Sequence, residues 1–206
     1  MMPAPVPQNA LSQTLPLRRW TAAEYRAMAD RGILTSQERT ELLDGHIVTM
    51  SAKGRPHVIT LRLLAQVLTT ALQGQRLIFL QDPIALSPTS EPEPDLAIVQ
   101  GQEWDYLHQH PQPEVIDLVV EVADSTLSKD REVKGLLYAQ AGIPEYWVVD
   151  VSQRQVWVFR NADPAGYRSR VIYDDTAHLS PLRFPDLHLA IADIFPPNLN
   201  FPDSQP

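Results

Sequence analysis

Two acidic residues at the ends of apolar segments are the side chains of this sequence best placed to do chemistry. Asp95 opens the segment DLAIV, and Glu121 interrupts the apolar run LVVEV. A buried carboxylate is costly unless it is paired or bound to a metal. If the two segments are neighbouring strands, both carboxylates converge on one point and need a cation between them, for which oxygen ligands favour Mg²⁺ or Mn²⁺. A solvent-facing position for each acid is equally open on pattern alone.

Three polar residues follow Glu121 at regular spacing. The segment SKDREVKGLLYAQAG predicts a helix that ends at Gly142, and Asp130, Lys134 and Tyr138 share one of its faces. Because this helix directly follows the strand of Glu121, Lys134 could reach back and orient a water nucleophile or stabilise charge on a phosphoryl group. The alternative is an exposed Asp130–Lys134 pair worth a few tenths of a kcal/mol, which the spacing alone favours.

Composition limits the classes of protein that the chain can form. The 206 residues are 44% hydrophobic and contain no cysteine, which is enough for one core and excludes disulfides, thiolate metal sites and a catalytic cysteine. No apolar run approaches the roughly 20 residues of a membrane helix, and the N-terminus lacks a signal-peptide core, so we expect a cytoplasmic protein. The net charge of −8 argues against nucleic-acid binding through bulk positive charge, although divalent cations held by carboxylates can supply that charge instead.

The elements that must position these residues are predicted from periodicity and turn signals. A helix capped by Thr21 and Glu24 precedes a hairpin that turns at Asp44-Gly45, and a long helix, apolar on nearly all sides, opens at His57. We expect strands at 76–82, 95–99, 115–122, 145–150, 155–160 and 167–175, and a last short helix within 187–195. The order predicts a mixed α/β domain over residues 17–195, with a central mixed sheet flanked by helices, between proline-rich tails at 1–16 and 196–206.

Several of these segments together resemble one known family. EPDLAIV, followed by DLVVEVADSTLSKDREVKGLLYAQAGIPEYWVVD, resembles the Uma-type restriction endonuclease family, formerly a domain of unknown function and similar to a branch of the PD-(D/E)xK nuclease superfamily. ELLDGHIV and the helix that opens at His57 also match, so that the similarity covers roughly residues 18 to 195. The resemblance implies a restriction-endonuclease-like core and a nuclease domain.

The resemblance also implies roles for single residues. Asp95 stands at the PD position and Glu121 at the acidic position of the second half-motif, but Ala123 stands where the wider superfamily has its lysine. In the Uma-type family the lysine appears on the following helix, where this chain has Lys134 with Asp130 and Tyr138 beside it.

Two upstream residues have two readings each. The resemblance places Glu41 with a further acidic metal ligand, while a polar lead into the hairpin is equally open for it. For His57 a capping or surface role is favoured over the supporting site role that the resemblance implies. His46 is expected on the surface of the hairpin.

The leading functional prediction is a Mg²⁺- or Mn²⁺-dependent endonuclease that hydrolyses phosphodiester bonds of DNA. Asp95, Glu121 and Glu41 would hold the metal, and Lys134 would assist catalysis. The alternative, favoured by the acidic charge, is a catalytically inactive nuclease-fold protein that binds or assembles with others. A sugar or nucleotide hydrolase would leave Lys134 without a role.

A homodimer is also predicted, because cutting both strands needs two sites and two-fold pairing is the commonest way to supply them. The strands at 145–150 and 155–160 are expected to form part of its surface. Trp147 and Trp157 are expected in the core or in that interface.

Overall fold

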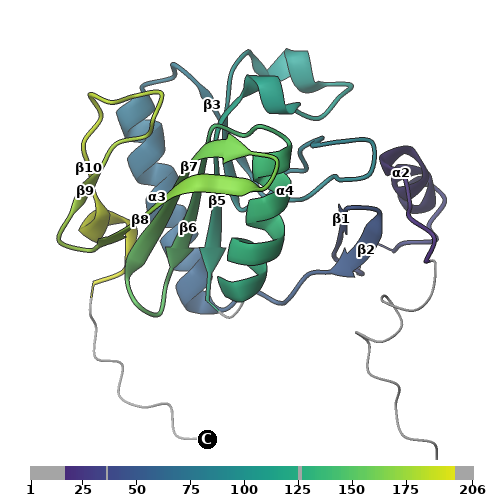
Figure 1. Cartoon of the computed structure of the whole chain (residues 1–206), viewed down its shortest axis with the longest axis horizontal. Helices are drawn as coiled ribbons and strands as arrows, with labels where there is room; N and C mark the ends of the chain where they lie inside the picture. Colours follow the sequence, from purple (N-terminus) through teal and green to yellow (C-terminus); the bar gives the residue numbers. More distant parts are fainter. Residues whose placement is uncertain (1–16, 36, 125–126, 198–206) are drawn as a thin grey trace, which may run out of the picture.

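A six-stranded mixed sheet forms the centre of the molecule (Figure 1). The structure is a computed structural model that describes residues 17–35, 37–124 and 127–197. All neighbouring strands are antiparallel except β5 and β6, which are parallel. This confirms the predicted mixed α/β fold. In spatial order the strands are β3 (Leu77–Leu80), β4 (Leu96–Val99), β5 (Ile116–Ala123), β6 (Glu145–Asp150), β7 (Gln155–Asp163) and β8 (Gly166–Asp174).

The two parallel strands are buried along their whole length. Their parallel pairing follows from the helical crossover between them, which consists of the π-helix η3 (Lys129–Lys134) and α4 (Gly135–Gln140). These helices cover one face of the sheet, where Tyr138 packs with Tyr146. The long helix α3 (Arg55–Leu72) covers the other face, where Leu64 and Leu68 pack with Trp147. Helices thus cover both faces of β5 and β6, and this is why these strands are apolar along their whole length.

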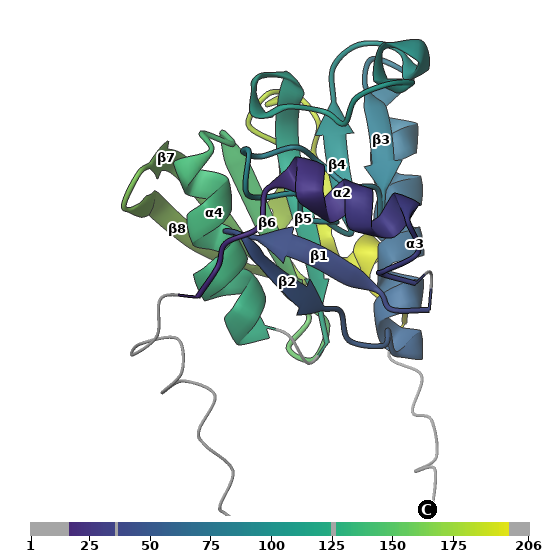
Figure 2. The ribbon, with the colours of Figure 1, turned by 90° about the vertical axis from the view of Figure 1, so that its right-hand side faces the viewer.

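The N-terminal elements lie beside α4, on the side of the sheet away from α3 (Figure 1 and Figure 2). They are α2 (Ala22–Asp30) and the hairpin of β1 (Thr40–Leu43) and β2 (His46–Thr49). The predicted capping box at Thr21 and the turn at Asp44-Gly45 are both confirmed. Asp44 and Gly45 have φ values of 47° and 76°, as a tight hairpin turn requires.

Helix α3 packs on the sheet through one buried stripe and leaves the apolar Ile59 43% exposed. The structure corrects the prediction about the dimer surface. The strand at 145–150 cannot supply a dimer surface, because β6 lies between β5 and β7 and every one of its residues is buried. Trp147 is accordingly a core residue, 1% exposed.

The chain closes with short elements beside α3. They are β9 (His178–Leu179), β10 (Leu189–Ala190) and the 3-10 helix η4 (Ile191–Ile194). Two further 3-10 turns, η1 (Glu103–Tyr106) and η2 (Pro113–Val115), lie earlier in the chain, before β5. The predicted tail at 1–16 and all but the start of the tail at 196–206 lie outside the described residues. Within the described part of the chain, no helix has both the length and the apolar character needed to cross a membrane.

Candidate active site

Asp95 and Glu121 lie together at one end of the sheet. Strands β4 and β5 are antiparallel neighbours in which Leu96 pairs with Val120, so that Asp95 and Glu121 occupy adjacent positions one step further along each strand. Both side chains are buried and line one small pocket of about 70 Å³. The predicted convergence of the two acids is confirmed.

Asp95 is held by four neighbouring groups. One oxygen, Oδ1, accepts from Gln81 Nε2 at 3.0 Å and lies 3.1 Å from His57 Nε2 and 3.5 Å from Lys53 Nζ. The other oxygen accepts from the Val122 amide at 2.9 Å. Burial alone would raise the pKa of Asp95, but the hydrogen bond to His57 and the amide of Val122 hold it below its usual value. Asp95 is therefore ionised and fixed in orientation.

His57 is buried beside Asp95, whereas the sequence pattern favoured a capping or surface role for it. It lies in the first turn of α3, is 7% exposed and contacts Asp95. The prediction of a surface role is wrong, because the packing of α3 against the sheet turns this face of the helix toward the carboxylates. The supporting role implied by the family resemblance agrees with this contact.

Glu121 is bound on one oxygen by two donors from the following helix. Lys134 Nζ and Tyr138 Oη each donate to Glu121 Oε1 at 2.8 Å. Burial raises the pKa of Glu121 to about 8, in spite of the nearby ammonium. The reading of Asp130 and Lys134 as an exposed pair is wrong, since these residues are 4% and 3% exposed.

The helix that carries these donors departs from the expected α-helix. Residues Lys129–Lys134 form a π-helix, and the Gly135 amide donates to the Asp130 carbonyl five residues earlier. The same carbonyl accepts from Tyr146 Oη at 3.0 Å. The wider turn ends where α4 begins, and π-helical turns of this kind are common at functional sites.

Glu41 is a further buried acid in contact with Lys134, which also contacts Glu121. It lies on β1, with Oε1 2.7 Å from Lys129 Nζ and Oε2 2.9 Å from Lys134 Nζ. Burial alone would raise the pKa of Glu41, but the two ammonium groups lower it. Burial alone would lower the pKa of Lys134, but Glu121 and Glu41 raise it above its usual range. Lys134 is thus a protonated ammonium between two carboxyl groups.

The sequence prediction missed several members of this site. All three lysines of the chain, Lys53, Lys129 and Lys134, line the pocket, although the chain has 17 basic residues in total. The scarcity of lysine among these basic residues was the one available signal. Gln81 carried no such signal, because it follows an ordinary apolar strand and turns back to Asp95 through a left-handed backbone with φ of 60°.

The oxygen donors of the pocket suit a hydrated divalent cation. Among the residues that the structure describes, no group of three or more histidine, aspartate or glutamate side chains is arranged to hold a metal ion. Mg²⁺, however, usually keeps several waters and takes only one or two protein carboxylates together with substrate phosphates. Asp95 and Glu121 offer such a pair. Both oxygens of Glu41 contact ammonium groups, so its role as a metal ligand stays a prediction.

Comparison with solved structures finds a protein of similar fold. The fold is similar to that of a protein whose crystal structure is titled a putative nuclease belonging to DUF820 from Anabaena variabilis ATCC 29413. The two are 17% identical with a TM-score of 0.68, and the alignment covers 85% of this chain and 97% of the other. No curated protein matches the chain in sequence.

The sequence pattern of one known protein family matches nearly the whole described chain. The match covers residues 22–192, which include the hairpin acid Glu41, both strand acids and the lysine-bearing helix. Its members are described as "Putative restriction endonuclease". The chain belongs to this family, Uma2.

Proposed function

We propose that this protein is a divalent-metal-dependent endodeoxyribonuclease. The observation that carries the proposal is the meeting of Asp95, Glu121 and Lys134 in one pocket, with the lysine donating to Glu121 at 2.8 Å. The buried ammonium can neutralise charge on a phosphodiester, and a divalent cation held by the two acids can position the attacking water. Membership of the Uma2 family supports a nucleic-acid substrate.

Each residue has a distinct role in the proposed reaction. A bound Mg²⁺ or Mn²⁺, held by Asp95 and Glu121, would supply charge neutralisation at the phosphate and a water of lowered pKa. Lys134 would orient the water nucleophile or balance the charge that develops on the phosphoryl oxygens. His57 would keep Asp95 in place through its 3.1 Å contact, and Tyr138 would do the same for Glu121.

The remaining lysines fit a substrate-binding role at the mouth of this pocket. The Lys129 side chain is 32% exposed and that of Lys53 is 15% exposed, whereas that of Lys134 is 4% exposed. Lys53 and Lys129 approach from different segments, next to Asp95 and Glu41 respectively. They can therefore attract the phosphates on either side of the bond that is cut, while Lys134 stays at the reacting centre.

The alternative of a catalytically inactive nuclease-fold protein is weakened by these same lysines. That alternative rested on the acidic net charge of the chain. The pocket nevertheless gathers all three lysines of the chain next to its six acidic residues. A local positive contribution next to paired acids is what a metal-dependent nuclease needs.

Metal titration combined with DNA incubation tests the proposal. Isothermal titration with Mn²⁺ should show binding to the wild type, and circular, linear and single-stranded DNA should be cut only when the metal is present. The Asp95→Ala, Glu121→Ala double variant should lose both properties. Equal Mn²⁺ binding by the wild type and the double variant would refute the site assignment.

We propose further that the protein acts as a homodimer, since cutting both strands requires two pockets. The buried position of β6 moves the candidate surface to the edge strand β8, where Val171 and Ile172 are 44% and 47% exposed. Sedimentation at tens of micromolar, roughly where obligate dimers persist, should show twice the 23.2 kDa chain mass. A species of 23.2 kDa alone would contradict the dimer.

A further inference from the structure

Two arginines lie over the ring of Trp157, and one of them belongs to η3, the helix that also carries Lys134. The guanidinium carbon of Arg131 lies 4.0 Å from the ring centroid of Trp157, and that of Arg170 lies 5.4 Å from it. Arg131 belongs to η3, Trp157 to β7 and Arg170 to β8, so that three separate elements meet here. Stacking on an aromatic ring holds a guanidinium in place and leaves its N–H groups free to bind another partner.

These two arginines lack the carboxylate partners that most other arginines of the chain have. Within residues 17–35, 37–124 and 127–197, neither Arg131 nor Arg170 forms an ion pair. By contrast, Arg76 pairs with Asp117 at 2.7 Å. Two stacked and unpaired guanidinium groups are therefore available for an anionic partner.

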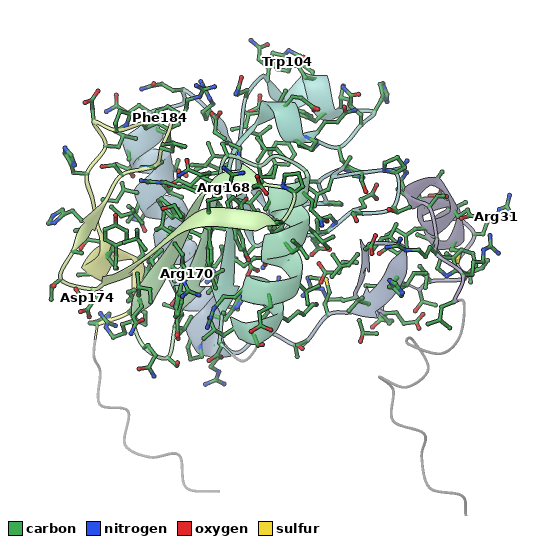
Figure 3. All side chains as sticks on the ribbon, in the orientation of Figure 1. Arg31, Trp104, Arg168, Arg170, Asp174 and Phe184 are labelled. Carbon is green, nitrogen blue, oxygen red and sulfur yellow. The ribbon has the colours of Figure 1, made fainter. Side chains whose placement is uncertain are left out.

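A surface groove of about 500 Å³ runs between η3, α4 and the β7–β8 hairpin at this position. Arg131 and Arg170 line it from two sides, and Phe159 and Tyr167 also contribute to its walls. Glu132, which is exposed, is the single carboxylate among the described residues that line the groove. Figure 3 shows Arg170 on β8, and Arg31 far from it, directly after the last residue of α2.

The groove lies next to the proposed active site along the same helix. Asp130 and Lys134 line the catalytic pocket, whereas Arg131 and Gly135 line the groove. Consecutive residues of η3 thus face two adjacent depressions. A polymer whose scissile phosphate lies in the pocket can continue over the first turn of this helix into the groove.

We infer that the groove lined by Arg131 and Arg170 holds the phosphate backbone of the DNA duplex next to the position of cleavage. This inference rests on the proposed nuclease function and adds the path of the substrate. Backbone binding is favoured over base stacking, because both arginines already stack on the single indole ring. Arginine contacts to phosphate hold a duplex in register and carry no sequence information directly.

DNA affinity at two salt concentrations tests the inference. The full chain is mixed with a labelled duplex of about 25 base pairs in EDTA, so that metal-dependent cleavage does not interfere, and fluorescence anisotropy gives Kd at about 50 and about 200 mM salt. Each phosphate contact contributes about 0.9 to the slope of log Kd against log salt. The Arg131→Gln, Arg170→Gln double variant should therefore have a slope lower by about 2, which makes its loss of affinity between the two salt concentrations about tenfold smaller.

A matched control distinguishes the loss of groove contacts from the loss of positive charge in general. Arg31 and Arg62 are exposed and, like the groove arginines, have no carboxylate partner among the described residues, so the Arg31→Gln, Arg62→Gln variant removes the same charge elsewhere. It should keep the wild-type slope. The Arg131→Lys, Arg170→Lys variant, which keeps both charges, should also restore the slope.

Three results would overturn the inference. They are a wild-type slope in the groove variant, an equal loss in both glutamine variants, and a failure of the lysine variant to restore binding while its thermal melt is normal. A wild type that binds no DNA would overturn it as well. Hydrolysis of bis(p-nitrophenyl) phosphate by the wild type with Mn²⁺ would then show whether the proposed active site still stands, since this small diester does not need the groove.

Discussion

Two buried glutamates on neighbouring strands of this protein have opposite surroundings. Glu145, on β6, is 0% exposed and accepts from Trp147 Nε1 at 2.9 Å, from Arg160 Nε at 2.8 Å and from the Leu182 amide. Glu121, on β5, is 4% exposed, and its two side-chain donors among the described residues, Lys134 and Tyr138, share one of its oxygens.

The two glutamates differ in the number of oxygens that are bound and in their access to a pocket. Glu145 joins strand, hairpin and closing segment through donors on both oxygens, and it does not line the pocket of Glu121. Glu121 faces a pocket that Asp95, Glu41 and Asp130 also line, and burial raises its pKa to about 8. A strongly shifted acid in a cleft is a candidate for function, whereas burial alone is not.

The sharpest test of this comparison is the same substitution at both positions. Glu121→Gln should lower the rate of DNA cleavage by about 10³-fold or more, because it removes a group that acts directly at the reacting centre. Its fold should persist, since Lys134 keeps Glu41 as a partner at 2.9 Å. Cleavage rate and thermal melting on one preparation measure both effects.

Glu145→Gln should show the reverse. It breaks a buried pair with Arg160 and should lower the free energy of unfolding by about 3 kcal/mol, while the folded fraction cuts DNA at the wild-type rate. If Glu145→Gln abolished cleavage at a temperature where the protein is folded, the distinction between the two glutamates would be lost.

Lys134→Ala should reduce cleavage by on the order of 10²–10³-fold while Mn²⁺ binding survives, because an ammonium is no metal ligand. The buried ion pairs to Glu41 and Glu121 also predict a loss of about 3 kcal/mol of stability. Cleavage therefore has to be measured well below the midpoint of the melt.

Lys129 is unsuitable as the control for this variant, since it contacts Glu41 at 2.7 Å. The exposed neighbour Val133, changed to alanine, alters the same helix without touching the cluster and should cut normally. A Lys134→Ala rate within about threefold of the wild type, less than one kcal/mol of barrier, would remove the lysine from the mechanism.

The raised pKa of Glu121 predicts a specific dependence of stability on pH. Its folded pKa of about 8 lies above the ordinary 4.5, so the folded protein keeps a proton that the unfolded chain releases. The resulting stability is present below pH 4.5 and is lost as the pH rises through about 8.

Denaturant unfolding of the metal-free protein at about pH 6 and about pH 8.5 should reveal a loss on the order of 2 kcal/mol. The Glu121→Gln variant should lose this dependence, and Glu145→Gln should keep it. An identical pH profile in all three proteins would show that Glu121 does not carry the proton.

The smallest expected effect belongs to Tyr138. Tyr138→Phe removes one hydrogen bond to Glu121 and leaves the ring in the core, so it should cost about 1 kcal/mol in stability and up to about tenfold in cleavage rate. Because Lys134 still holds the same oxygen, the pKa shift of Glu121 should persist. A loss as large as that of Lys134→Ala would mean that Tyr138 acts at the reacting centre and not as a positioning residue.

Local patterns in the sequence predicted most of the fold and three residues of the candidate site, Asp95, Glu121 and Lys134. Alternation, turn residues and caps predicted the strands, the hairpin at Asp44-Gly45 and the helix capped by Thr21, because these signals depend on neighbours in the chain. The convergence of Asp95 and Glu121 followed from two adjacent strands, and the reach of Lys134 followed from the helix after them.

Only the tertiary structure decided the contacts of Glu41, Lys129, Lys53 and His57. These residues come from β1, from η3, from the segment before α3 and from α3 itself, and no local period specifies which distant element fills a given space. The same reason applies to β6: its sequence shows an apolar strand, but its buried position depends on β7 and β8 folding beyond it. A buried charge cluster forms where separate elements pack, and packing between elements distant in the chain is a property of the whole fold.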